Sequence, residues 1–221
     1  MTHSDTDRLN LLPPERQAVL TALESYWREL RGARRLPVRT EVDPARIDAA
    51  LPHAMILERV GAGIARLRVA GGTIVAHAGM EARGLPLSAL FGCGSREQLA
   101  ETLEQVFAGP ALLDLPVSVT RGLWRGKMHG RLLVLPLLGR GGSVDRALAA
   151  LVMQGDLPGG GRSIDIERDG AMRLLPIPAP LAVCEVAPRR LMVAAQGGAP
   201  RPMADGAPPR PALRLVVSNP R

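Results

Sequence analysis

Cysteine and aromatic residues are scarce in this chain of 221 residues. Its only cysteines, Cys93 and Cys184, stand far apart with no other soft ligands beside them, which excludes a disulfide framework and a cysteine-rich zinc site. Two Trp, one Tyr and two Phe provide no platform on which single-stranded nucleic acid could stack. The two isolated cysteines fit a protein of a reducing compartment.

Long apolar runs are also missing. No apolar stretch without a charge approaches the roughly 20 residues of a membrane-spanning helix; the run from Leu132 to Gly139, for example, is far shorter, and Pro136 interrupts it. The N-terminus is polar and acidic, whereas a secretory signal carries a basic region followed by an apolar one. We therefore expect a cytoplasmic protein without a membrane partner.

Motifs that mark common catalytic sites are absent too. The sequence contains no Gly-x-Ser-x-Gly elbow, no phosphate-binding loop and no dinucleotide fingerprint. The four histidines have no spacing that would bring three or four ligands to one metal ion; they are His3, His53, His77 and His129. We expect no enzymatic activity and no metal, and the sequence identifies no cofactor.

Cys93 is the one candidate for thiol chemistry. It lies between two glycines, directly before a helix that we expect to be capped by Ser95. The dipole of that helix would favour the thiolate, which makes Cys93 a candidate redox thiol. The alternative is an unreactive cysteine in a turn, since the sequence places no base or second thiol beside it.

Positive charge is in excess. The chain has 28 basic and 21 acidic side chains, a net charge of +7, and every basic residue except Lys127 is arginine. Four of them cluster as Arg31, Arg34, Arg35 and Arg39. Guanidinium groups bind phosphates, and Arg35-x-x-x-Arg39 matches the first half of the PilZ motif for cyclic dinucleotides, although its second half is missing. The cluster predicts either an anion site of a nucleotide- or nucleic-acid-binding regulator or, as we favour, a solvated face with internal pairs such as Arg39 with Asp43.

An amphipathic helix is predicted from Pro13 to Leu30. A proline suits the first helical turn, Gly32 ends the pattern, and apolar side chains recur at intervals of three and four residues. This stripe consists of Val19, Leu23, Tyr26, Trp27 and Leu30. Such a helix either covers a sheet or pairs with a second copy, so these five residues are candidates for a homodimer interface.

The next segments alternate between strands and short helices. A short helix is predicted over 45–51, strands over 54–60 and 64–70, and turns with one-turn helices over 71–94. Within the second strand, Ala65, Leu67 and Val69 are expected on one face. A longer helix follows Ser95, and three strands are predicted over 111–121, 127–138 and 144–153, although the spacing of the last run also fits a helix.

This order of elements resembles a PAS domain. The string Trp27-Arg28-Glu29-Leu30-Arg31-Gly32, continued by Asp43-Pro44 and Leu51-Pro52, resembles the opening of a PAS-like family found in alphaproteobacteria. The segments 65–72 and 84–91 are similar to that family's second strand and helical connector. The resemblance covers roughly residues 20 to 155.

The resemblance implies an α+β fold, in which a five-stranded antiparallel sheet with short connector helices follows an N-terminal amphipathic helix. It also implies a non-enzymatic sensory or regulatory module that acts through a protein partner, with a small apolar ligand between sheet and connector as a further expectation. The residues expected to line that pocket are Leu67, Val75, His77, Leu90, Leu103, Leu133 and Leu135. His77 stands in the connector, where some relatives bind haem iron, so a haem sensor or a Cys93 thiol sensor is the weaker alternative.

Three regions are expected along the chain. Residues 1–35 form the N-terminal helix and entry segment, and residues 36–155 form the PAS-like domain. Residues 156–221 form an extension that holds 11 of the 20 prolines. The runs 181–186, 190–195 and 213–217 are candidates for short strands or binding segments in that extension.

Overall fold

The structure is a computed structural model that describes residues 12–120, 126–167 and 170–178. Its centre is an antiparallel sheet in the order β2-β1-β5-β4-β3-β6, and β7 also pairs with β3. The strands are β1 Ala54–Gly61, β2 Ile64–Ala70, β3 Ala111–Thr120, β4 Lys127–Leu137, β5 Arg146–Met153, β6 Ile164–Ile166 and β7 Arg173–Pro176. The five predicted strands are confirmed, and the sheet gains two further strands from the C-terminal extension.

The run that fitted both helix and strand is the strand β5. Its residues pair with β1 on one side and with β4 on the other, so β5 lies in the middle of the sheet. Pairing on both sides gives ladder partners to the backbone N–H and C=O groups along both edges of β5. This long-range arrangement overrides a spacing of apolar residues that also suits a helix. Topology decides the assignment where periodicity alone could not.

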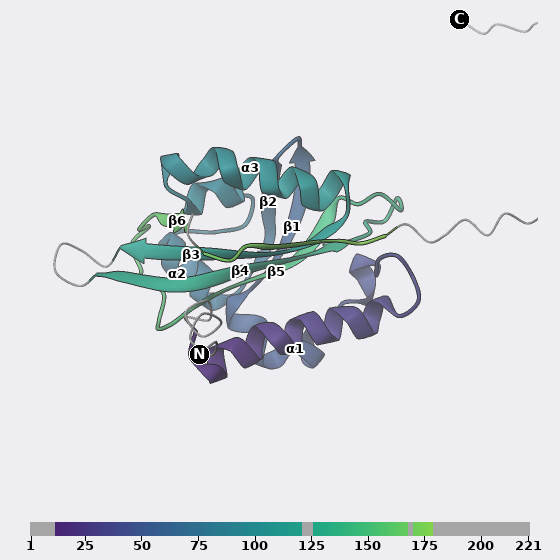
Figure 1. The fold of residues 1–221 in the computed structure, drawn as a ribbon, viewed down its shortest axis with the longest axis horizontal. Coiled ribbons are helices and arrows are strands. Elements are labelled where there is room, and N and C mark those ends of the chain that lie inside the picture. The colour runs from purple at the N-terminus through teal and green to yellow at the C-terminus, as the bar shows by residue number, and fades with distance from the viewer. Residues whose placement is uncertain (1–11, 121–125, 168–169, 179–221) are drawn as a thin grey trace, which may run out of the picture. The chain divides into compact units, whose positions relative to one another are not determined.

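Helices cover both faces of the sheet (Figure 1). On one side, which we name the connector face, lie α2 Gly72–Ala78, η4 Leu87–Leu90 and α3 Cys93–Ala108. On the other side, which we name the α1 face, lie α1 Pro14–Arg31 and the 3₁₀ segment η3 Pro44–His53, which follows the short η2 Arg39–Glu41. Because both faces are covered, β3, β4 and β5 are buried almost without interruption instead of alternating between buried and exposed residues.

The helix α1 confirms the prediction for residues 13–30 almost to the residue. Pro14 occupies its first turn, and Gly32 ends it with a φ of 53°, a backbone conformation that favours glycine. Its buried side chains are Leu20, Leu23, Tyr26 and Trp27. The Trp27 indole N–H donates to the carbonyl of Pro136 in β4 at 3.0 Å, which fixes the helix against the sheet.

A bulge in β2 corrects the prediction for Val69. Ile56 and Leu57 are neighbours in β1, but their partners in β2 are Val69 and Leu67, so β2 holds one extra residue, Arg68, at this point. The bulge turns Val69 away from the connector face, and its side chain is 52% exposed, whereas Leu67 is fully buried. The prediction that Ala65, Leu67 and Val69 share one face of the strand is therefore wrong for Val69.

Two further predictions need correction in the connector. Residues 72–78 form a true helix, α2, where only turns and one-turn helices were expected. Burial of Ile74 and His77 stabilises this helix despite Gly72 and three β-branched residues. The helix α3 begins at Cys93, after Gly92, so Ser95 lies inside its first turn and is not its cap. The Ser95 hydroxyl instead accepts the backbone N–H of Ile166 at 3.0 Å and so holds β6 against α3.

The C-terminal extension is part of the sheet over its first residues. Val117–Val119 of β3 pair with β6, and Ala111–Asp114 pair with β7. The structure therefore continues beyond the boundary expected at residue 155. The candidate strands at 181–186, 190–195 and 213–217 lie outside the described residues, as do Cys184 and His3.

Candidate functional site

The predicted pocket residues do not come together in one place. Leu67, Leu90 and Leu103 are buried in the core of the connector face, as expected, but Val75 on α2 is 39% exposed. Leu133 and Leu135 lie on the α1 face, on the opposite side of the sheet, and the prediction was wrong for both. The run Leu132–Leu135 is apolar at every position, so no alternation in it indicates which side chains face the connector.

His77 is buried and joins α2 to the segment after β5. Its Nδ1 lies 2.6 Å from the carbonyl oxygen of Pro158, and its own carbonyl accepts the N–H of Gly161. The other ring nitrogen, Nε2, is buried without a hydrogen-bond partner among the described residues. One ring nitrogen therefore serves a structural contact, and the haem hypothesis is left with Nε2 alone.

Cys93 is exposed at the first residue of α3. The expected position at a helix N-terminus is confirmed, although Cys93 belongs to the helix and not to a preceding turn. Within the described part of the chain, no group of three or more His, Cys, Asp or Glu side chains is placed to hold a metal ion. Thiol chemistry at Cys93 stays a prediction.

The four clustered arginines have different surroundings. Arg31 donates to the carbonyl of Arg34 and lies over the Trp27 ring, 5.9 Å from its centre. Arg34 forms an ion pair with Glu41 at 2.8 Å; this hydrogen bond lowers the pKa of the Glu41 carboxyl from its ordinary value. Arg35 is exposed, and Arg39 is half-buried. The side chains of Arg35 and Arg39 have no ion-pair partner among the described residues, so the suggested pair of Arg39 with Asp43 does not form.

The apolar stripe of α1 faces the sheet. Leu23, Tyr26 and Trp27 are 6% exposed or less, while Val19 and Leu30 pack at the edge of the same core. Of the two uses predicted for this helix, the structure shows the covering of the sheet. A homodimer that used these five side chains would first have to lift α1 from its own domain.

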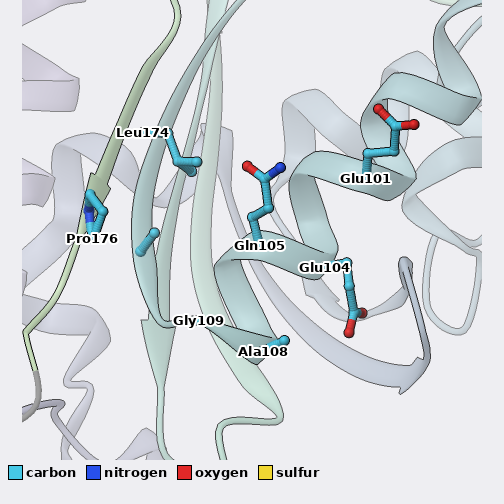
Figure 2. Close-up of a pocket in the computed structure, with 8 residues that line it drawn as sticks. Glu101, Glu104, Gln105, Ala108, Gly109, Leu174 and Pro176 are labelled. Carbon is cyan, nitrogen blue, oxygen red and sulfur yellow. The ribbon is translucent and has the colours of Figure 1, made fainter.

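A groove that the sequence did not predict lies between α3 and β7. We name it the α3–β7 groove; it has a volume of about 620 Å³. Glu101, Glu104, Gln105, Ala108 and Gly109 line its helix side, and Ala111, Leu174 and Pro176 line its strand side. Figure 2 shows Gln105 between the helix and Leu174, with both glutamates on the helix side. The groove therefore has an apolar strand wall and an acidic helix wall.

The two glutamates of the groove differ in their hydrogen-bond and ion-pair partners. Glu104 accepts the backbone N–H of Gly63 at 2.9 Å and pairs with Arg59 at 2.5 Å. The hydrogen bond from Gly63, followed by that from Arg59, lowers the pKa of Glu104 from its ordinary value, so the carboxylate is ionised at neutral pH. Glu101 is exposed and has no ion-pair partner in the described part of the chain. No basic residue lines this groove.

The strand β7 is anchored by charged groups of three elements. Asp114 of β3 accepts from Arg131 of β4 at 2.6 Å, and both side chains are nearly buried. The same Asp114 lies 3.6 Å from Arg173 of β7, and Arg173 in turn lies 3.6 Å from Glu24 of α1. Arg131 also donates to the carbonyl of Ala171. This network fixes the residue next to Leu174 and so positions the strand side of the groove.

Sequence reasoning missed the groove for a simple reason. Its two sides come from α3 and from a strand about 70 residues later, and only the pairing of β7 with β3 brings them together. The short apolar pair Leu174-Leu175, bounded by Arg173 and Pro176, was the only local sign of a strand. Four residues are too few for a periodicity to be recognised.

Comparison with known proteins gives one family. A family model described as PAS domain matches residues 16–152. No curated protein matches the chain. Among the described residues, no helix combines the length and apolar character needed to cross a membrane.

Proposed function

Because the PAS model covers residues 16–152, the chain belongs to the PAS domain family, and we propose that it is a non-enzymatic regulatory module of the cytoplasm that binds a protein partner in the α3–β7 groove. PAS domains are typically sensory modules without catalysis of their own. The observation that carries the proposal is the groove itself, which joins an acidic wall to an edge of β7 that no other strand of the described residues pairs with. The scarcity of cysteine fits the reducing environment of the cytoplasm.

The groove suits an extended segment with basic and apolar side chains. The strand β7 pairs with β3 along one edge, and none of the described residues pairs with its other edge. An extended segment could add to that edge through backbone hydrogen bonds. Every second side chain of such a segment would then face the connector side and lie in the groove, next to Leu174 and Pro176 and within reach of the carboxylates of Glu101 and Glu104. Complementary charge would select the partner.

Other expectations from the sequence stay predictions. A homodimer is one of them, although the α1 stripe is already packed on the sheet. An apolar ligand beside Leu67, Leu90 and Leu103 is another. We also propose membership of the alphaproteobacterial branch of the family, which rests on the string from Trp27 to Pro44. Nothing observed favours the nucleotide, haem or thiol alternatives, and we do not propose them.

The proposal is tested with two short synthetic peptides, one that alternates leucine with arginine and one that alternates leucine with glutamate. Binding is followed by fluorescence polarisation of the labelled peptides. The leucine–arginine peptide is expected to bind and the leucine–glutamate peptide is not, because only the first complements the acidic wall.

Variants locate the binding. Glu101→Lys reverses an exposed charge of the groove and should weaken the leucine–arginine peptide by about tenfold, which corresponds to about 1.4 kcal/mol. The matched control, Glu81→Lys, reverses an exposed charge that does not line the groove and should leave the affinity close to wild type. Equal binding of both peptides, or equal effects of both substitutions, would refute the proposed groove.

A further inference from the structure

A second concave site lies at the other edge of the sheet, on the α1 face. It is enclosed by η2, η3, β1 and β2, has a volume of about 200 Å³, and we name it the Arg39 pocket. Its apolar walls include Val42, Ile47, Leu51, Ile56, Val69 and Leu148. Arg39 is the one charged residue among those that line it. The proposed partner groove plays no part in this site.

The floor of the Arg39 pocket is rigid and its rim is open. Ile47, Ile56 and Leu148 are buried in the core of the α1 face, so their positions are fixed by packing. At the rim, Val69 is 52% and Leu51 is 36% exposed. The bulge at Arg68 places Val69 there, because without the extra residue Val69 would face the connector. Bulges often occur next to binding sites, where they redirect a side chain.

The backbone of Arg39 is held in place, whereas its guanidinium group has no partner among the described residues. Its backbone N–H donates to the carbonyl of Leu138 at 2.8 Å, which fixes the main chain at the mouth of the pocket. Its guanidinium group has no hydrogen-bond or ion-pair partner among the described residues, whereas the neighbouring Arg34 and Arg46 are paired with Glu41 and Glu29. A half-buried guanidinium group without a carboxylate is a ready donor to an anion.

A second cleft adjoins the Arg39 pocket and is lined by further arginine residues. It has a volume of about 490 Å³, and Arg39 lines it together with Thr40, Arg140 and Arg146. Arg146 is paired both with Asp145, at 3.1 Å, and with Glu58, at 2.5 Å, so Arg140 is the second arginine of this cleft that has no ion-pair partner in the described part of the chain. Arg39 therefore stands between an apolar compartment and a polar one that opens beside it.

We propose that the Arg39 pocket binds a small monocarboxylate, with its apolar body among Val42, Ile47 and Leu148 and its carboxylate on the guanidinium group of Arg39. The volume is below the roughly 300–1,000 Å³ of sites for drug-sized ligands, so the body is a short aliphatic chain or a single ring. This site lies on the face of the sheet opposite to the pocket expected from the sequence.

The test uses hexanoate and benzoate as probes, with hexanol and benzyl alcohol as neutral counterparts of the same shape. Each is titrated into the full chain, and the backbone amide signals are followed by NMR. Both acids are expected to shift the signals of Val42, Ile47 and Val69, and the alcohols are expected to bind at least about tenfold more weakly, because they lack the charge that Arg39 would pair with.

Two substitutions distinguish a specific site from general attraction by a basic protein. Arg39→Gln should weaken hexanoate by about tenfold or more, whereas Arg35→Gln, which removes an exposed and equally unpaired charge of the same cluster, should leave the affinity unchanged. Because Arg39 has no side-chain partner in the described part of the chain, both variants should melt at the same temperature.

A third variant keeps the proposal falsifiable if Arg39→Gln does not fold. Val69→Asp places a carboxylate at the exposed rim and should also weaken hexanoate. The proposal is overturned if the alcohols bind as well as the acids, if Arg35→Gln and Arg39→Gln have the same effect, or if the shifted signals lie outside the Arg39 pocket.

Discussion

The Arg39 pocket and the α3–β7 groove lie at opposite edges of one sheet and differ in almost every property. The pocket is small, apolar and enclosed, and it has one arginine at its mouth on the α1 face. The groove is about three times larger, with carboxylates on its helix wall and, on its strand wall, an edge of β7 without a strand partner among the described residues. The first suits a small anion, and the second suits an extended basic segment of a protein.

This difference shows what covering both faces does to a PAS sheet. Because α1 occupies the face opposite to the connector, neither face offers its strands as a broad docking surface within the described chain. Concave surfaces instead form where the covering helices reach the sheet edges, at β2 and at β7. The chemistry of each edge then depends on a few side chains that the edge elements happen to carry, such as Arg39 or Glu101.

The largest expected loss of stability comes from α1, because its side chains form much of the core on the α1 face, where the Arg39 pocket lies. Trp27→Ala removes a fully packed indole and its hydrogen bond to Pro136, and should lower the free energy of unfolding by about 3–5 kcal/mol. Urea unfolding, followed by circular dichroism, measures the change. The control Val19→Ala shortens a half-buried side chain of the same helix and should cost about 1 kcal/mol or less. Equal and small effects of both would show that α1 is an appendage and not part of the fold.

An intermediate effect is expected at the groove. Asp114→Ala leaves Arg131 buried without its carboxylate and releases Arg173 of β7, which should cost roughly 3 kcal/mol of stability. The leucine–arginine peptide should also bind more weakly, while hexanoate should bind as to wild type, because Asp114 does not line the Arg39 pocket. Asp48→Ala, at an exposed residue, is the control for both measurements. Loss of both ligands together, in a variant that is still folded, would contradict two separate sites.

The smallest effect is a difference in pH response between the two edges. His53 is the last residue of η3. Its burial, and next the positive charge of Arg16, lower the pKa of the imidazole, while the charge of Asp156 raises it. The unfolded chain takes up this proton near pH 6.5, so stability is fully present above that value and falls as the pH decreases through the lowered pKa. At the groove, Glu104 stays ionised over the same range because its pKa is lowered from 4.5.

His53→Gln should therefore flatten the loss of stability between about pH 7.5 and about pH 5.5. The measurement is the urea midpoint of the variant and of the wild type at both values. If the two proteins lose the same amount of stability on acidification, His53 does not cause the dependence.

Local patterns in the sequence predicted the elements well. The stripe of α1 shows a helical period, and the strands β1 to β5 stand out as apolar segments separated by turns, so a PAS-like order followed from them. The same patterns could not say what the stripe covers, because Leu23 and Trp27 suit a sheet as well as a second copy of the helix.

The two sites depend on features without a local signal. The Arg39 pocket requires the bulge that redirects Val69, and the groove requires the pairing of β7 with β3 across more than 50 residues. The faces of Leu133 and Leu135 were misassigned because β4 is apolar on both sides. In each case the decisive information is a register, which strand pairing sets and a single strand does not reveal.

The most direct test of two chemically opposite sites is a single NMR experiment on the full chain with both probes. Hexanoate and the leucine–arginine peptide are added separately and then together. We predict that hexanoate shifts the amide signals of Val42, Ile47 and Val69, that the peptide shifts those of Gln105, Ala108 and Leu174, and that the mixture gives the sum of the two sets. One shared set of shifted signals would contradict the account.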